Sequence, residues 1–416
     1  MERTPSFLKW LASALAGIAL FTGLFLLKGN GRATPLPPEI TASASPTATN
    51  ATTERDLHDL LVTVTRDDQR ISGGFLIVAN KNVTKIHIFN IVPRVVVDTQ
   101  GDLPIDLATA GFESGSSRVQ QALQDASGVK IDGSLVLQRL ALAGLVDSVR
   151  GIDIVNPSPV RVRIQEHRAL TIPAGKVHLD GSRAAAYALA RVAKEEPSAQ
   201  TRRIDIVLRE TLAHLPYAEK RMKETLSSLG SLSRTTIPTG DVANYLVSLE
   251  RKHLWQDAQS TPFATVPSAL GGRTKTSWQR FDLAQVMQQV GDFTPSAFVP
   301  FTKTSIRVAV SSKSAQDRLS ARRDFRNTPF VFVDNGHQSS PKVTQVRVLS
   351  AVTPKTIVGL RKALGLKKVE VSYQAKSSST AARTSGALIS GHRIADITVT
   401  LGVDYRALHN NKESVD

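Results

Sequence analysis

The chain contains no cysteine among its 416 residues. Disulfide bonds, thiolate zinc sites, cysteine nucleophiles and a lipid-modified lipobox cysteine are therefore excluded. Aromatic residues make up only 5% of the sequence, and the basic residues are dispersed along the chain. Helices that bind nucleic acid usually combine clustered basic residues with interleaved aromatic ones, and no such segment is found. We therefore expect no nucleic-acid partner.

The chain also has fewer acidic residues than basic ones. The chain has 36 Asp and Glu residues against 52 Lys and Arg residues, which gives a formal net charge of +16. Such an excess of positive charge favours polyanionic partners, because summed charges attract an oppositely charged ligand over long distances. With nucleic acid set aside, the expected partner is a polyanion of a lipid surface or a cell wall.

One long uncharged apolar run occurs near the N-terminus, over residues 10–27. Eighteen residues at the helical rise are just enough to cross a hydrocarbon core, so we predict a single transmembrane anchor here. A cleaved signal peptide is the alternative, but the small residues at 42–44 lie too far beyond the run. The short segment 1–9 is then cytoplasmic, and the long remainder lies outside a single-pass membrane protein. Residues 28–55 are rich in Pro, Ala, Ser and Thr and form the expected linker.

Residues 56–298 alternate between short apolar runs and segments of helical spacing. Such alternation predicts an α/β domain, with a mixed α+β sheet flanked by helices. The predicted strands cover 60–64, 74–79, 85–91, 152–154 and 160–162, and the predicted helices cover 119–126, 135–149, most of 204–230, 240–255 and 282–290. Residues 262–276 are predicted to be a loop.

Residues 304–408 are predicted to form a second, small α/β domain, followed by a tail over 409–416. Strands are expected at 306–310, 343–349, 369–371 and 394–401, with a helix at 356–364. Two similar Val-rich strand starts raise the question of an internal duplication of 304–345 and 346–408, which one sequence does not answer.

The segment over residues 175–191 contains a turn with glycine, then a helix of small residues that ends on Arg191. A second basic pair, Arg202 and Arg203, begins the next amphipathic run. Arginine binds phosphate oxygens through two parallel hydrogen bonds and keeps its charge at any physiological pH. Two guanidinium groups from neighbouring helices therefore indicate a phosphate or pyrophosphate site. A surface position or a structural ion pair is the alternative for each of these arginines.

Three segments, in order, resemble the LytR-CpsA-Psr family of bacterial cell-envelope proteins with a LytR-type C-terminal domain. Residues 175–191 are similar to that family's Gly-Lys-x-His-Leu-Asn/Asp-Gly…Ala-Tyr-Ala-x-x-Arg motif. Residues 145–154 resemble its Leu-Val-Asp-x-x-Gly-Gly-Val segment, and residues 395–405 resemble the closing motif of the C-terminal domain.

The resemblance implies a bacterial membrane protein whose external domain moves a glycopolymer from a polyprenyl-pyrophosphate carrier onto peptidoglycan. It implies the lipid-linked polymer, peptidoglycan and membrane lipid as partners. Pyrophosphate ligands carried over from the family motifs are Arg94, Arg191 and Arg203, with Arg202 adjacent.

The family's Mg²⁺ is implied as well, but the sequence departs from the family at the positions of its metal ligands. Gly73 and Val95 stand where carboxylates are expected, and Leu189, Ile206 and Val207 replace polar or basic residues. Nearby acids are the candidate replacements. No metal ligand is assigned: Asp98 and Asp102 are weak candidates, with Asp67 and Asp68 as further options, and each also fits a solvated turn.

These departures leave two functions open, and no catalytic residue is assigned. The chain is either a glycopolymer phosphotransferase of this family or a catalytically lapsed relative that binds lipid-linked polymer or cell wall as a scaffold. A regulator that binds nucleic acid is disfavoured, because the predicted body lies on the far side of the membrane from DNA.

Overall fold

The computed structural model describes six stretches of the chain, residues 57–165, 168–192, 195–216, 218–270, 278–374 and 395–413. The predicted anchor, linker and the end of the tail lie outside them. None of the helices in the described stretches is both long enough and apolar enough to span a membrane.

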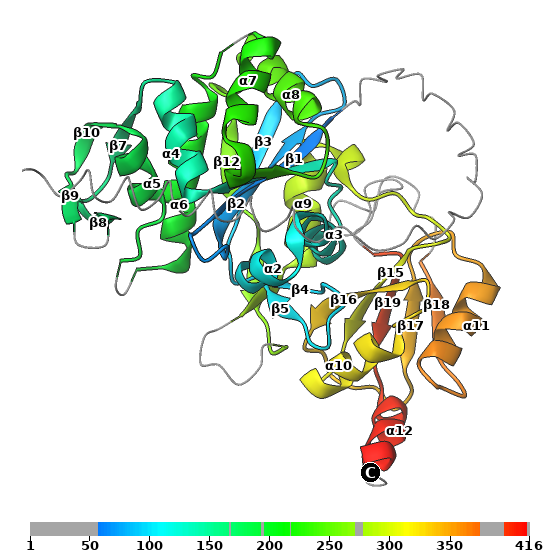
Figure 1. The fold of residues 1–416 in the computed structure, drawn as a ribbon. Helices are drawn as coiled ribbons and strands as arrows, with labels where there is room; N and C mark the ends of the chain where they lie inside the picture. The colour runs from blue at the N-terminus through cyan, green and yellow to red at the C-terminus, as the bar shows by residue number, and fades with distance from the viewer. Residues whose placement is uncertain are drawn as a thin grey trace, which may run out of the picture. The chain divides into compact units, whose positions relative to one another are not determined.

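A six-stranded mixed sheet forms the centre of residues 57–298, in the order β11-β6-β1-β2-β3-β12 (Figure 1). Its strands are β1 Asp59–Thr65, β2 Ile71–Ala79, β3 Ile86–Ile91, β6 Gly133–Gln138, β11 Ser233–Thr235 and β12 Gln259–Pro262. β2 runs antiparallel to both β1 and β3, whereas β6 runs parallel to β1. β1 and β2 are buried along their whole lengths, as expected for strands that are covered on both faces.

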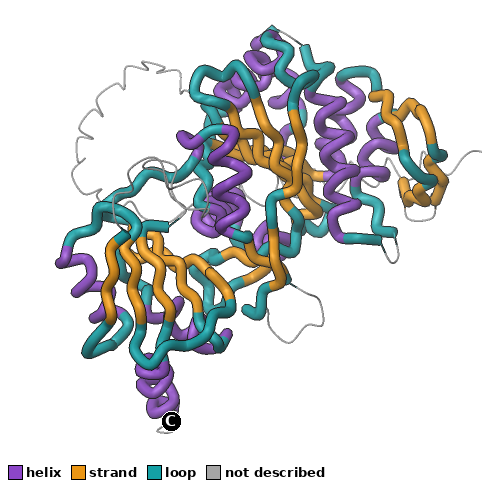
Figure 2. Tube along the Cα trace, turned by 180° about the vertical axis from the view of Figure 1, so that it is seen from behind, coloured by secondary structure: helices purple, strands orange, loops and turns teal. Residues whose placement is uncertain are grey.

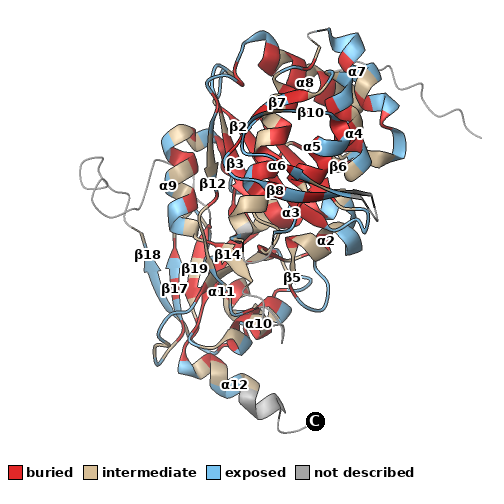
Figure 3. Ribbon diagram, turned by 90° about the vertical axis from the view of Figure 1, so that its left-hand side faces the viewer, coloured by how far each residue is buried: buried red, intermediate tan, exposed pale blue. Residues whose placement is uncertain are grey.

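Helices cover both faces of this sheet, and each face has its own hydrophobic core. One face is covered by α4 Arg139–Ser148, α5 Gly181–Ala188, α6 Pro197–Leu212, α7 Glu219–Ser228 and α8 Thr239–Arg251. The other is covered by α2 Leu107–Glu113, α3 Gly115–Ser127 and α9 Leu283–Phe293. Figure 3 shows buried residues concentrated in the strands and on the helix sides that meet them.

Four two-stranded ladders and two short 3₁₀ helices complete this part of the chain. The ladders are β4 Val96–Val97 with β5 Ile105–Asp106, β7 Ile152–Asn156 with β10 Gly175–Leu179, β8 Val160–Gln165 with β9 Arg168–Ile172, and β13 Thr265–Pro267 with β14 Gln279–Phe281. The 3₁₀ helices are η1 Gly230–Leu232 and η2 Pro295–Ala297.

A second sheet, of five strands in the order β16-β15-β19-β17-β18, is formed by residues 306–400 (Figure 2). Its elements are β15 Ile306–Ser311, α10 Ala315–Asp324, β16 Phe330–Gly336, β17 Gln345–Val348, α11 Pro354–Ala363, β18 Glu370–Tyr373, β19 Ile397–Thr400 and α12 Val403–Glu413. This sheet has its own hydrophobic core. Each of the pairs β15–β16 and β17–β18 is parallel and has one helix between its strands, so two β-α-β units follow one another.

The mixed α/β architecture predicted from the sequence is confirmed, and most predicted elements are present within a few residues. The prediction of one helix over 135–149 was wrong. Residues 133–138 form β6, because they pair in parallel with β1, and only 139–148 are helical. A short apolar run satisfies the strand and the helix pattern equally, and pairing with a distant strand decides between them. The predicted loop over 262–276 contains β13, and its residues 271–277 lie outside the described stretches.

Candidate anion-binding site

The segment over residues 175–191 folds as a strand followed by a short helix. β10 ends at Leu179, and the side chain of Asp180 caps α5 by accepting a hydrogen bond of 2.8 Å from the Arg183 N–H. Gly181 begins the helix so close to α4 that a Cβ there would lie 2.1 Å from the Ala143 carbonyl oxygen. Glycine is therefore required for this packing, which fixes the direction of α5 and the position of Arg191 just beyond its end.

A pocket of about 430 Å³ lies where several chain segments meet at one end of the central sheet. Its walls come from the β1–β2 turn, the segment after β3, the start of α2 and the chain between α5 and α6. It is lined by Arg66, Arg70, Ile71, Ser72, Pro93, Arg94, Asp106, Ala108, Ala190, Arg191, Val192, Glu195, Glu196 and Gln200. Four of these residues are arginines. Two of the predicted ligands, Arg94 and Arg191, are therefore brought together although 97 positions separate them in sequence.

Arg66 and Arg70, the other two arginines, were not predicted from the sequence. They flank the turn between β1 and β2, where the Arg66 N–H donates to the Arg70 carbonyl oxygen at 3.0 Å. Asp68 stabilises the turn by accepting hydrogen bonds from the Arg66 guanidinium at 3.0 Å and from the Arg70 N–H at 3.1 Å. The turn is tight, so both arginines are held at the same end of the sheet.

Positive charges of different arginines interact in the pocket, and two of the polar groups of its residues have no partner. The pKa of Arg66 is lowered, first by its partial burial and then by the positive charge of Arg191. Within the described stretches, neither the buried Nε of Arg66 nor the buried hydroxyl of Ser72 has a hydrogen-bond partner. A bound anion would relieve the repulsion between the arginines. The arrangement is therefore suited to a multiply charged phosphate or pyrophosphate.

Arg203, a predicted ligand, lies behind the pocket wall and does not line the pocket. Its side chain is only 6% exposed. The guanidinium forms a two-pronged ion pair with Glu195 and donates to the carbonyl oxygens of Tyr187 at 3.1 Å and Ala190 at 2.7 Å. These bonds hold the chain between α5 and α6 in place. Arg203 therefore supports the wall that carries Arg191.

The remaining predicted residues lie elsewhere. Arg202 is exposed on α6 and does not line the pocket. Asp98, a weak candidate for a metal ligand, is ion-paired: both of its carboxylate oxygens accept hydrogen bonds from Arg322, at 2.6 and 2.7 Å. The Asp102 side chain is fully exposed, 3.6 Å from Arg326. Asp67 is bound by Arg139, at 3.0 Å from each carboxylate oxygen.

The two positions where the resemblance implied carboxylates are both structural. Val95 is fully buried in the core beneath α2, α3 and α9. Gly73 lies in β2 with φ +151°, and a Cβ there would lie 3.1 Å from Ile204 Cδ1 on α6. These positions therefore pack the sheet against its helices.

The carboxylates that do line the pocket do not fit a magnesium ion well. Asp106 caps α2 by accepting from the Thr109 N–H at 2.8 Å, and Glu195 is engaged by Arg203. Glu196 is exposed at the start of α6. Mg²⁺ prefers several converging oxygen ligands, and no group of three or more acidic or histidine side chains in the described stretches is arranged to hold a metal. We therefore derive no chemical step through a metal ion.

Comparison with known families agrees with the sequence motifs. Residues 86–254 match the model of the LytR_cpsA_psr family. This part of the chain is similar to the LytR-CpsA-Psr family. It contains Arg94 and Arg191, whereas Arg66 and Arg70 precede it. No curated protein matches the chain.

Solved structures with a related arrangement include TagV of B. subtilis, at 16% identity and a TM-score of 0.47, covering 56% of this chain and 96% of that one. A LytR-Csp2A-Psr enzyme from Actinomyces oris has 16% identity and a TM-score of 0.45, and the match covers 58% of this chain and 90% of that one. TagT bound to LI-WTA has 15% identity and a TM-score of 0.44, and the match covers 57% of this chain and 89% of that one. At such identities and scores these likenesses carry no argument about function.

Proposed function

We propose that this protein is a glycopolymer transferase whose arginine pocket binds the pyrophosphate of a polyprenyl-linked glycopolymer. The observation that carries the proposal is the convergence of Arg66, Arg70, Arg94 and Arg191 on one pocket of a LytR-CpsA-Psr domain. The acceptor class that fits the family is peptidoglycan. A predicted anchor over residues 10–27 would keep the pocket near a lipid-linked donor at the outer face of a bacterial membrane.

The chemistry available to these side chains is the positioning of phosphates and the stabilisation of charge. When a phosphoryl group is transferred, negative charge develops on the leaving and equatorial oxygens, and fixed positive groups lower the energy of that state. Four arginines present several N–H donors and keep their charge throughout the reaction. These residues would therefore account for donor binding and for charge stabilisation.

The test is the transfer of a labelled lipid-linked saccharide to peptidoglycan by the purified full chain. Arg94→Ala and Arg191→Ala should each reduce the transfer rate. Arg161→Ala is the matched control, since Arg161 is exposed on β8 and does not line the pocket. If pyrophosphate binds but no saccharide is transferred, with or without Mg²⁺, the lapsed scaffold replaces the transferase as the function. If neither occurs, the pocket assignment is wrong.

A further inference from the structure

The chain between β3 and α2 forms a hairpin, residues 93–108, that connects the arginine pocket to the C-terminal sheet. At its base, Pro93, Arg94, Asp106 and Ala108 line the pocket. The base is closed by backbone hydrogen bonds from the Leu107 N–H to the Val95 carbonyl and from the Ala108 N–H to the Pro93 carbonyl, at 2.8 and 2.9 Å. β4 and β5 form its two arms, and residues 98–102 form its tip.

The tip of this hairpin is bound by Arg322, which lies on α10 of the C-terminal part. The Arg322 guanidinium donates to both Asp98 carboxylate oxygens, to the Gly101 carbonyl at 2.7 Å and to the Asp102 carbonyl at 3.0 Å. Its side chain is only 2% exposed. A planar guanidinium that makes four hydrogen bonds fixes the position and the orientation of its target.

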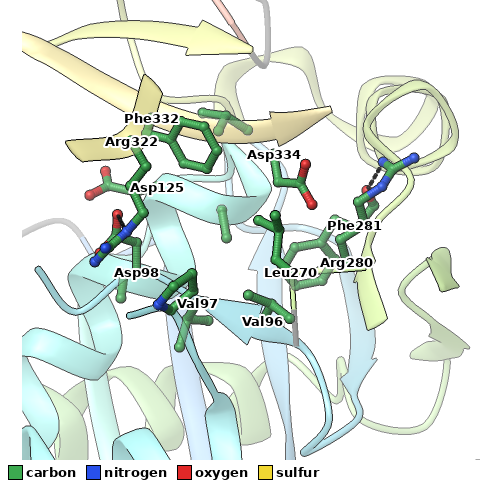
Figure 4. Close-up of a pocket in the computed structure, with 14 residues that line it drawn as sticks. Val96, Val97, Asp98, Asp125, Leu270, Arg280, Phe281, Arg322, Phe332 and Asp334 are labelled. Carbon is green, nitrogen blue, oxygen red and sulfur yellow. Dashed lines mark hydrogen bonds and ion pairs between the residues drawn. The ribbon is translucent and has the colours of Figure 1, made fainter. Parts of the chain in front are cut away.

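A separate contact attaches the C-terminal sheet to α3. Arg307, on β15, donates to the carbonyl oxygens of Gln124 at 3.3 Å and of Asp125 at the end of α3. Figure 4 shows the pocket between these parts, with Arg322, Asp98 and Asp125 together at one end and Asp334 and Arg280 toward the other. Arg326, just beyond α10, also donates to the Gly101 carbonyl at 2.6 Å, so losing Arg322 should loosen the tip, while Arg307 still holds the sheet against α3.

We infer that Arg322 is a positioning residue for the arginine pocket, so that the C-terminal domain tunes anion binding through the 93–108 hairpin. The inference rests on the proposed function, because it assigns a regulator to the same pocket. The hairpin is short and closed at its base, so displacement of its tip is transmitted to Arg94 and Asp106. Thermodynamic linkage requires the reverse effect as well: an anion in the pocket should stabilise the hydrogen bonds between Arg322 and the tip.

The experiment measures inorganic pyrophosphate binding to the full chain by calorimetry, together with hydrogen exchange of peptides from residues 93–108. Arg322→Ala should weaken binding about 5-fold or more, the lower end of typical coupling between sites, and should speed exchange in the hairpin. Pyrophosphate should slow that exchange in the unmodified chain and have less effect in Arg322→Ala. Arg323→Ala is the matched control, since Arg323 is exposed on α10 and donates to Ser320 of its own helix.

Asp98→Asn provides a second variant should Arg322→Ala fold poorly, because it alters the less buried partner of the same contact. The double variant should bind no more weakly than Arg322→Ala alone, since both changes break one interaction. Unchanged affinity in a folded Arg322→Ala or Asp98→Asn chain, despite faster exchange at the tip, would overturn the inference and leave the pocket intact. Failure of the unmodified chain to bind pyrophosphate would overturn the proposed function, and the coupling with it.

Discussion

Arg203 binds Glu195 through both terminal nitrogens of its guanidinium and holds the α5–α6 connection from behind the arginine pocket. Arg191, on that same connection, is exposed and lines the pocket. Two arginines that look equivalent in the sequence therefore act differently, one on the stability of the wall and one on the ligand.

The first prediction separates these roles. Arg203→Ala should lower the free energy of unfolding by about 3–5 kcal/mol, because it leaves a partly buried carboxylate and two carbonyl groups without a donor. Arg191→Ala should leave stability nearly unchanged but weaken pyrophosphate binding by about 1.5–3 kcal/mol, or roughly 10- to 150-fold. Urea unfolding and calorimetry give the two quantities. A stable Arg203→Ala chain that fails to bind would show that Arg203 contacts the ligand directly.

The second prediction concerns the arginines of the β1–β2 turn. Arg66→Ala and Arg70→Ala should each weaken pyrophosphate binding, Arg66 more, because its side chain is the more buried and its Nε lacks a partner. The expected loss for Arg66 is again about 1.5–3 kcal/mol. Arg161→Ala should bind as the unmodified chain does. Equal affinity in all three variants would restrict the site to Arg94 and Arg191.

The family resemblance pointed to Arg94, and the helix pattern of residues 175–191 together with that resemblance pointed to Arg191. Sequence reasoning missed Arg66 and Arg70 because a polar turn with mixed charges resembles any solvated turn. Their role depends on which segments the sheet order places beside that turn. No local pattern encodes that order.

Asp98 is a second residue whose role depends on a partner that is distant in sequence. Its partner Arg322 lies 224 positions away, in the C-terminal part of the chain. A turn carboxylate that seemed free for a metal is therefore part of a buried ion pair. The strands β1 and β2 were predictable because burial on both faces leaves short apolar runs, and β3 was predictable because its apolar and polar residues alternate. The contacts between side chains that define the site were not.

The third prediction concerns pH and the start of β1. Asp59 is 1% exposed, its N–H donates to Asp132 at 3.1 Å, and its Oδ1 lacks a partner within the described stretches. Burial, and then the charge of Asp132, raise its pKa well above the ordinary value of 3.8. The folded state thus favours the protonated acid. This contribution to stability is complete below pH 3.8 and is lost as the pH rises through the folded pKa.

Asp59→Asn keeps a neutral side chain of the same shape at every pH. The variant should therefore gain stability relative to the unmodified chain as the pH rises above about 4, and should be the more stable of the two at pH 7. Urea unfolding between pH 4 and pH 8 measures the difference. Asp257→Asn, at an exposed turn position, is the control and should follow the unmodified chain. A difference that shrinks with rising pH would reverse the assigned direction of the pKa shift.

The last prediction is that restoring carboxylates at Gly73 and Val95 will destabilise the fold and will not create a magnesium site. At Gly73, φ is +151° and a Cβ would lie 3.1 Å from Ile204 Cδ1 and 3.3 Å from Thr201 Oγ1, so Gly73→Asp combines backbone strain of about 1–3 kcal/mol with crowding against α6. Val95→Asp places a carboxylate in a fully buried apolar site, where the acid would remain protonated and so be a poor metal ligand. Gly240→Asp is the control, because a Cβ there meets nothing within 4 Å at the start of α8. Thermal unfolding with increasing Mg²⁺ measures both effects. A saturable rise in Tm of the Gly73→Asp, Val95→Asp chain, absent from the control, would show that the two positions can converge on a cation after all.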